Sequence, residues 1–108
     1  MNKVLRYEER YKVKNNKINE YNELLLEFKE MLKEIDIPHL IDWYVEQDKY
    51  IPGDIRNVWI LEEQADVDKM WDITFSNEKW SSLVARIFET MVDGSYTYGF
   101  WTKIISLE

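Results

Sequence analysis

The first stretch of the chain, from Val4 to Val13, alternates apolar and charged side chains. The apolar positions are Leu5, Tyr7, Tyr11 and Val13, and the charged positions between them are Arg6, Glu8, Arg10 and Lys12. A period of two is typical of a strand with one buried face. We therefore expect a β-strand here, with Glu9 on the apolar face between two tyrosines. The alternating charges of the other face suit either solvent or pairing across a dimer.

The next stretch has apolar positions three and four residues apart, which predicts a long amphipathic helix. These positions are Ile18, Tyr21, Leu25, Phe28, Leu32 and Ile35. Asn15 or Asn16 offers an N-cap, and Pro38 ends the helix because it disfavours helical geometry at the preceding residue. Residues 40–47 then favour a strand. Pro52-Gly53 favours a type II turn over 51–54, so we expect a hairpin with a third strand from about 55 to 61.

Two helical segments and a last strand complete the pattern. Val67, Met70, Trp71 and Phe75 mark the buried stripe of the first segment, and Trp80, Val84, Ile87 and Met91 mark that of the second. Ser76-Asn77 separates the two, and either residue can cap the second segment. Gly94 suits a left-handed helix end. The last strand is expected over 96–107.

The predicted order is βαββαβ in one domain over 1–108, the arrangement of ferredoxin-like α+β folds, with a four-stranded antiparallel sheet and helices on one face. The later strands are apolar on both faces: Trp59 and Leu61 point one way, and Val58 and Ile60 the other. An apolar open face favours association. The pattern therefore predicts a homodimer packed sheet to sheet.

The composition excludes several classes of binding partner. The net charge of −7 repels nucleic acid and anionic membrane surfaces, and no apolar run is long enough to span a bilayer. The chain has no cysteine, which excludes disulfides and thiolate metal sites and is compatible with the cytoplasmic location that we expect. His39 has no carboxylate at a spacing that suggests a shared metal site, so neither a metal nor a cofactor is predicted.

Three segments resemble the NIPSNAP family of the dimeric α+β barrel superfamily and the neighbouring antibiotic-biosynthesis monooxygenase family. Residues 11–17 match the end of the family's first strand, with Asn15 and Asn16 in place of its Pro and Gly. Residues 59–71 match a strand Trp followed by a helix that carries a second Trp. Residues 77–80, Asn-Glu-Lys-Trp, lie where the family has Asp-Pro-Glu-Trp and keep the nine-residue spacing between Trp71 and Trp80. The resemblance implies a ferredoxin-like fold that closes into a barrel on dimerisation.

The resemblance also bears on chemistry. Haem-degrading members of the superfamily use an Asn, a Trp and a His at positions that match Glu9, Trp71 and Val84. Only the Trp is retained, so haem degradation is not carried over. NIPSNAP-like sequences usually have an Arg at the position of Glu9, and the charge is therefore reversed here.

The candidate site follows from the apolar face of the first strand. We expect Tyr7, Tyr11, Trp71 and Trp80 to line a pocket for a small apolar or aromatic ligand between sheet and helices. Glu9 is a candidate proton acceptor, although we favour a structural role, in which it is hydrogen-bonded to a tyrosine or paired with a Lys or Arg at the sheet edge. Two alternatives stay open. One is a cofactor-independent monooxygenase or isomerase, and the other is a dimeric interaction module with a filled core.

Overall fold

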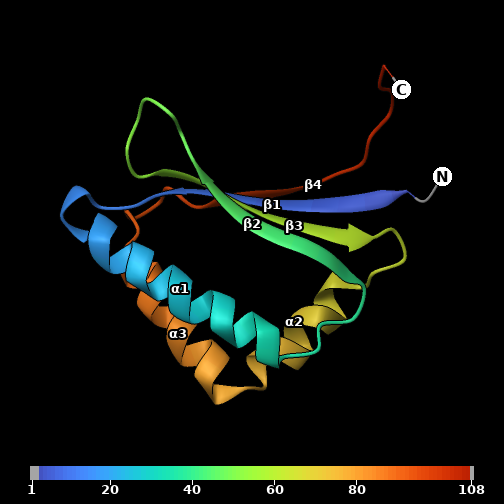
Figure 1. Ribbon diagram of the computed structural model, residues 1–108, viewed down its shortest axis with the longest axis horizontal. Coiled ribbons are helices and arrows are strands. Elements are labelled where there is room, and N and C mark those ends of the chain that lie inside the picture. The colour runs from blue at the N-terminus through green and yellow to red at the C-terminus, as the bar shows by residue number, and fades with distance from the viewer. Residues whose placement is uncertain (1–2, 108) are drawn as a thin grey trace.

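The computed structural model describes residues 3–107 and has the predicted order of elements (Figure 1). The strands are β1 (Val4–Lys12), β2 (Leu40–Gln47), β3 (Asp54–Glu62) and β4 (Thr97–Trp101). The helices are α1 (Ile18–Glu34), α2 (Val67–Phe75) and α3 (Glu78–Glu89), and a 3-10 turn, η1 (Asn15–Lys17), precedes α1. The ferredoxin-like α+β fold predicted from the sequence is therefore confirmed.

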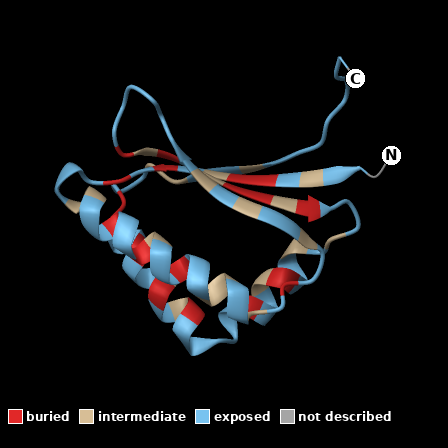
Figure 2. Cartoon of the chain, viewed as in Figure 1, coloured by how far each residue is buried: buried red, intermediate tan, exposed pale blue. Residues whose placement is uncertain are grey.

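The four strands form an antiparallel sheet in the order β2-β3-β1-β4, with all the helices on one face (Figure 1). Tyr7 pairs with Trp59, and Trp59 with Trp43 on the other side. This register aligns the apolar positions of three strands on the face toward the helices. Figure 2 shows that the buried residues gather between that face and the helices. Within the described residues, no helix is long and apolar enough to cross a membrane.

The core is unusually rich in aromatic rings. Trp59 and Trp80 are each 1% exposed, and Phe28 of α1 packs against both of them, with its ring centroid 4.9 Å from that of Trp80. Trp59 and Trp71 meet edge to face at 5.5 Å. Such edge-to-face pairs add stability beyond the burial of area. The aromatic residues thus hold the sheet and the three helices together.

The turn between β2 and β3 has the geometry that Pro52-Gly53 predicted. The Asp54 N–H donates to the Ile51 carbonyl oxygen at 3.2 Å, and Gly53 has a φ of 84°. A Cβ on Gly53 would lie 2.9 Å from the Val13 carbonyl oxygen, so a side chain is excluded by space as well as by backbone conformation. The turn therefore anchors the end of β1.

Three expectations near helix ends are wrong. Asn15 and Asn16 lie inside the 3-10 turn, and no side chain caps α1. The Lys14 N–H is instead bonded to the Thr90 carbonyl oxygen at 2.8 Å, which fixes the backbone before a side chain can cap the helix. Met91 is not helical, because α3 ends at Glu89, and Met91 forms an isolated β-bridge with Val13. Gly94 has a φ of 76°, but it lies in the turn after the helix rather than at its end.

The last strand is also shorter than predicted. It ends at Trp101, and residues 102–107 have no regular structure. Trp101 pairs with Arg6, and β1 begins only two residues earlier, so the segment beyond Trp101 runs off the sheet. Its apolar side chains Ile104, Ile105 and Leu107 are almost fully exposed. Alternating apolar residues suggested a strand there, but no neighbouring strand is available to pair with them.

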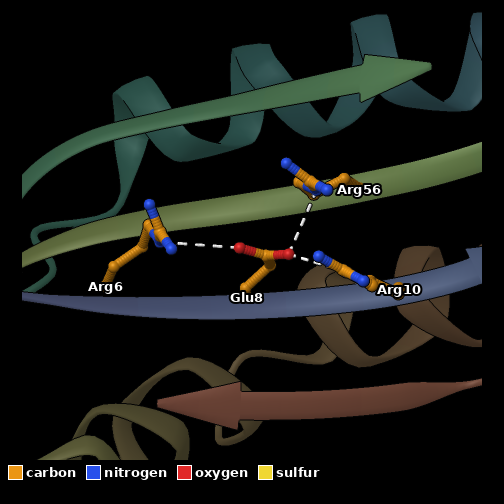
Figure 3. A network of polar contacts seen from close by, with 4 residues as sticks. All are labelled: Arg6, Glu8, Arg10 and Arg56. Atoms are coloured by element: carbon orange, nitrogen blue, oxygen red, sulfur yellow. Dashed lines mark hydrogen bonds and ion pairs between the residues drawn. The ribbon is translucent and has the colours of Figure 1, made fainter. Parts of the chain in front are cut away.

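The sheet face away from the helices contains a charge cluster that the sequence did not indicate. Figure 3 shows Glu8 surrounded by Arg6, Arg10 and Arg56, at N–O distances of 3.5, 2.7 and 3.1 Å. The arginine side chains are about half exposed, whereas Glu8 is only 4% exposed. A carboxylate on an open sheet face is thus buried by its own ion-pair partners.

Candidate functional site

A cavity of about 270 Å³ lies between the sheet and the helices. All five residues singled out from the sequence line it: Tyr7, Glu9, Tyr11, Trp71 and Trp80. The other lining residues are Leu25, Phe28, Asn57, Trp59, Phe75, Val84, Ile87, Phe88, Met91 and Tyr96. The interior of the protein is therefore not completely filled, and its free space has mainly aromatic walls.

The backbone explains how these side chains come together. The alternation of β1 directs Tyr7, Glu9 and Tyr11 toward the helices. Trp71 and Trp80 are nine residues apart, or about two and a half helical turns, so an unbroken helix would place them on opposite sides. The break between α2 and α3 removes this conflict. Asn77 caps α3 by accepting a hydrogen bond from the Trp80 N–H at 3.1 Å, and the two indole centroids lie 6.5 Å apart.

Glu9 is the centre of a hydrogen-bond network. Its Oε1 accepts bonds from Trp59 Nε1 at 2.9 Å and from Asn57 Nδ2 at 3.3 Å. Its Oε2 accepts a short bond from the Tyr96 hydroxyl, which lies 3.2 Å from the hydroxyl of Tyr7. Asn57 in turn accepts a bond from Trp43 Nε1 at 2.6 Å. The cavity thus has one polar cluster in an otherwise apolar, mainly aromatic lining.

Burial dominates the ionisation of this cluster. It raises the pKa of Glu9 above the ordinary value, although the bonds from Tyr96 and Trp59 act in the opposite direction. Burial and the nearby Glu9 charge raise the pKa of Tyr7 to about 12, and they also raise that of Tyr96. Burial raises the pKa of Tyr11 and Tyr21 as well, whose hydroxyls are bonded to each other. The four tyrosines consequently remain hydrogen-bond donors at neutral pH.

The sequence missed the partners of Glu9. Asn57 carried a usable signal, since it is a polar residue at an apolar position of β3, between Ile55 and Trp59. Tyr96 carried none, because it lies just before β4 and reaches Glu9 from 87 residues away. Val84, which matched the histidine position of haem-degrading relatives, lines the cavity beside Trp71 and Glu9.

The described residues contain no group of three or more His, Asp or Glu side chains that could hold a metal ion. His39 is far from regular ligand geometry: it is 42% exposed, and its Nδ1 lies 3.7 Å from a Glu62 oxygen at the edge of the sheet. The functional groups that the described residues bring to the cavity are a carboxylate, an amide, hydroxyls and aromatic rings.

No family model matches the sequence, and no curated protein matches it. Solved structures do. A NIPSNAP family protein from Agrobacterium tumefaciens aligns with a TM-score of 0.74 and 15% identity over 95% of this chain and 88% of its own. A candidate antibiotic biosynthesis monooxygenase from Caulobacter crescentus aligns with a TM-score of 0.73 and 12% identity over 96% and 92%.

A cofactor-independent oxygenase from Streptomyces nogalater also aligns, with a TM-score of 0.71 and 8% identity over 97% of both chains. At these identities the likeness concerns the fold and does not extend to activity. The chain has the ferredoxin-like α+β fold shared by NIPSNAP and antibiotic-biosynthesis monooxygenase structures, as its sequence motifs indicated.

Proposed function

We propose that the protein binds a small, largely apolar or aromatic molecule in the cavity between sheet and helices. The observation that carries the proposal is a space of about 270 Å³ whose walls are aromatic and aliphatic except for the cluster around Glu9. Ligand sites are typically apolar pockets with a few placed polar groups, and their volumes begin at about 300 Å³. The size here suits a molecule of one or two rings.

Access to the cavity supports the same proposal. Phe75 and Phe88 line it and are 48% and 46% exposed, so its walls reach the molecular surface. Glu9 is one of the residues that line the cavity, so a molecule in the cavity can contact it. A structural void left by imperfect packing would not need a polar cluster with this access.

Filling the cavity tests the proposal. We expect Val84→Phe to weaken binding of neutral one- and two-ring molecules by at least about tenfold, because Val84 is part of the cavity wall. The measurement is isothermal titration calorimetry with a panel that includes phenethyl alcohol and indole. Val92→Phe is the matched control, since Val92 is 41% exposed and lies outside the cavity lining. Equal affinities for the two variants, or no binding by the wild type across the panel, would contradict the proposal.

We also propose that two copies associate through the open sheet faces. Tyr44 and Trp101 are 38% and 53% exposed there, and the same face has the basic Arg6 and Arg10 on β1 and the acidic Asp42 and Glu46 on β2, two strands away. A twofold axis can place the basic strand of one copy over the acidic strand of the other, which makes the face complementary to itself. The expected mass in light scattering is twice 13.2 kDa. The cytoplasmic location expected from the cysteine-free sequence belongs to the same proposal.

The enzyme alternative requires Glu9 to take a proton from a bound substrate. Among the described lining residues Glu9 is the one carboxylate, and its raised pKa suits a proton acceptor. If turnover of a bound aromatic substrate is found, Glu9→Gln should abolish it while binding persists. Turnover that survives Glu9→Gln would exclude this role.

A further inference from the structure

We propose that the ligand carries an organic ammonium group, which pairs with the carboxylate of Glu9 inside the aromatic cavity. This inference rests on the proposed ligand-binding function and adds a chemical class to it. Its first ground is a contrast between two adjacent carboxylates of β1. Glu8, on the open face, is enclosed by three arginines (Figure 3). Glu9, on the cavity face, makes no ion pair with any described residue.

The second ground is the direction of the hydrogen bonds around Glu9. An indole N–H can only donate, so the bond from Trp43 fixes the Asn57 oxygen toward Trp43 and the Asn57 amino group toward Glu9. Trp59 also can only donate. Oε1 thus receives two donated bonds whose direction cannot be reversed, and such bonds stabilise the ionised form against the opposing effect of burial.

The charge of that carboxylate has no counter-ion in the cavity. No lysine or arginine is among the described lining residues. Three donors occupy the carboxylate, and two carboxylate oxygens offer about four acceptor positions, which leaves room for one more donor. A partly buried charge that is solvated by dipoles but unpaired gains most from a cation.

The walls suit the same ligand. A cation is attracted to the faces of aromatic rings, most strongly to those of tryptophan. Trp59, Trp71 and Trp80 all line the cavity, together with several tyrosine and phenylalanine rings. An anionic ligand would instead be repelled by Glu9, and a purely apolar ligand would leave its charge uncompensated. The combination of one carboxylate and aromatic walls therefore selects a small aromatic amine.

Three molecules of nearly the same shape test this inference: phenethylamine, phenethyl alcohol and phenylacetate. We expect calorimetry to show that the amine binds at least about tenfold more tightly than the alcohol, and that phenylacetate binds most weakly. Glu9→Gln should remove the preference for the amine and retain binding of the alcohol, which also shows that the variant is folded. Glu63→Gln is the matched control, because it removes an exposed carboxylate far from the cavity lining and changes the net charge equally.

A pH series on the wild type provides a second readout that needs no variant. The titratable groups around Glu9 are tyrosines: Tyr7 and Tyr11 on β1, Tyr21 on α1, Tyr96 just before β4, and Tyr98 on β4. Helices α2 and α3 add none to the described lining. Burial raises the pKa of Tyr7 to about 12 and raises those of Tyr11, Tyr21 and Tyr96 above the ordinary value, so these hydroxyls stay protonated between about pH 5 and 8. Affinity for the amine should therefore fall as the pH is lowered from about 8 to 5, because Glu9 gains a proton, while affinity for the alcohol stays constant.

The outcomes separate this inference from the function on which it rests. Equal affinity for amine and alcohol, with Val84→Phe weakening both, would overturn the ammonium inference and leave ligand binding intact. A preference for phenylacetate would also overturn it. If none of the three molecules binds and Val84→Phe changes nothing, the binding function itself fails.

Discussion

At the scale of single residues, Glu8 and Glu9 show how one strand places two carboxylates in opposite environments. Alternation along β1 directs Glu8 to the open face and Glu9 to the cavity. Glu8 is balanced by three guanidinium groups, whereas Glu9 is balanced only by dipoles from Trp59, Asn57 and Tyr96. The charge of Glu8 is therefore paired within the protein. The charge of Glu9 is left unpaired and available to a ligand.

The unfolding free energy of the ligand-free protein should depend on pH through the ionisation of Glu9. Burial raises the pKa of this group in the folded state, so the folded protein binds its proton more tightly than the unfolded chain does. Between the ordinary value of about 4.3 and the raised folded value, the unfolding free energy of the wild type should therefore fall as the pH rises. The measurement is urea unfolding of wild type and Glu9→Gln in parallel. Their difference in unfolding free energy should change across this range, and a constant difference would contradict the assignment.

At the scale of elements, short-range patterns predicted most of the structure. Periods of two and of three to four residues located β1 and the helices, residue preference located β2, and the Pro52-Gly53 turn located β3. This turn and the Asn77 cap have the predicted geometry. The Asn15/Asn16 cap and the extent of the last strand were wrong, because long-range contacts decide both: Lys14 is bonded to Thr90, and β1 begins only two residues before Arg6, the partner of Trp101, so most of residues 102–107 have nothing to pair with.

For the candidate site too, short-range patterns predicted part of the structure and long-range contacts determined the rest. The alternation of β1 and the two helical stripes were enough to predict Tyr7, Glu9, Tyr11, Trp71 and Trp80 around one space. The partners of Glu9 depend on the register between strands and on where the chain returns before β4. Short-range sequence patterns determine neither of these features, so the contacts of Asn57 and Tyr96 with Glu9 are found only in the folded structure.

The hairpin turn offers a test at this scale. Gly53→Ala should destabilise the protein by about 2–4 kcal/mol, because it combines a left-handed conformation with a contact of 2.9 Å to the Val13 carbonyl oxygen. Gly94→Ala has a similar φ of 76° but nothing within 4 Å of the added Cβ, so it should cost only about 1–2 kcal/mol. Thermal or urea unfolding measures both. Equal losses would show that the contact with β1 is unimportant.

At the scale of the whole molecule, helices cover one face of the sheet and leave the other bare (Figure 1). Tyr44 of β2 lies on the bare face and is the cross-strand partner of Val58 of β3, which is only 1% exposed. A dimer through this face would bury the apolar residues and arginine stems that are now partly open to water.

Paired tyrosine variants test this interface. We expect Tyr44→Asp to shift the protein from dimer to monomer at micromolar concentration, because it places an unpaired charge within the contact. Tyr50→Asp is the control, since Tyr50 is 82% exposed at the tip of the hairpin and away from the sheet face. Sedimentation or light scattering reads the result. A monomeric wild type, or a dimer unaffected by Tyr44→Asp, would exclude association through this face.

Native mass spectrometry of freshly purified protein shows whether the cavity holds a ligand. We expect a species of twice 13.2 kDa that carries a reproducible adduct, and the adduct should be lost on denaturation. The adduct should be absent from Val84→Phe and retained by Val92→Phe. An adduct of basic, aromatic character would further agree with the pairing to Glu9. An adduct that persists in Val84→Phe would place the bound molecule elsewhere and contradict the assignment of the cavity.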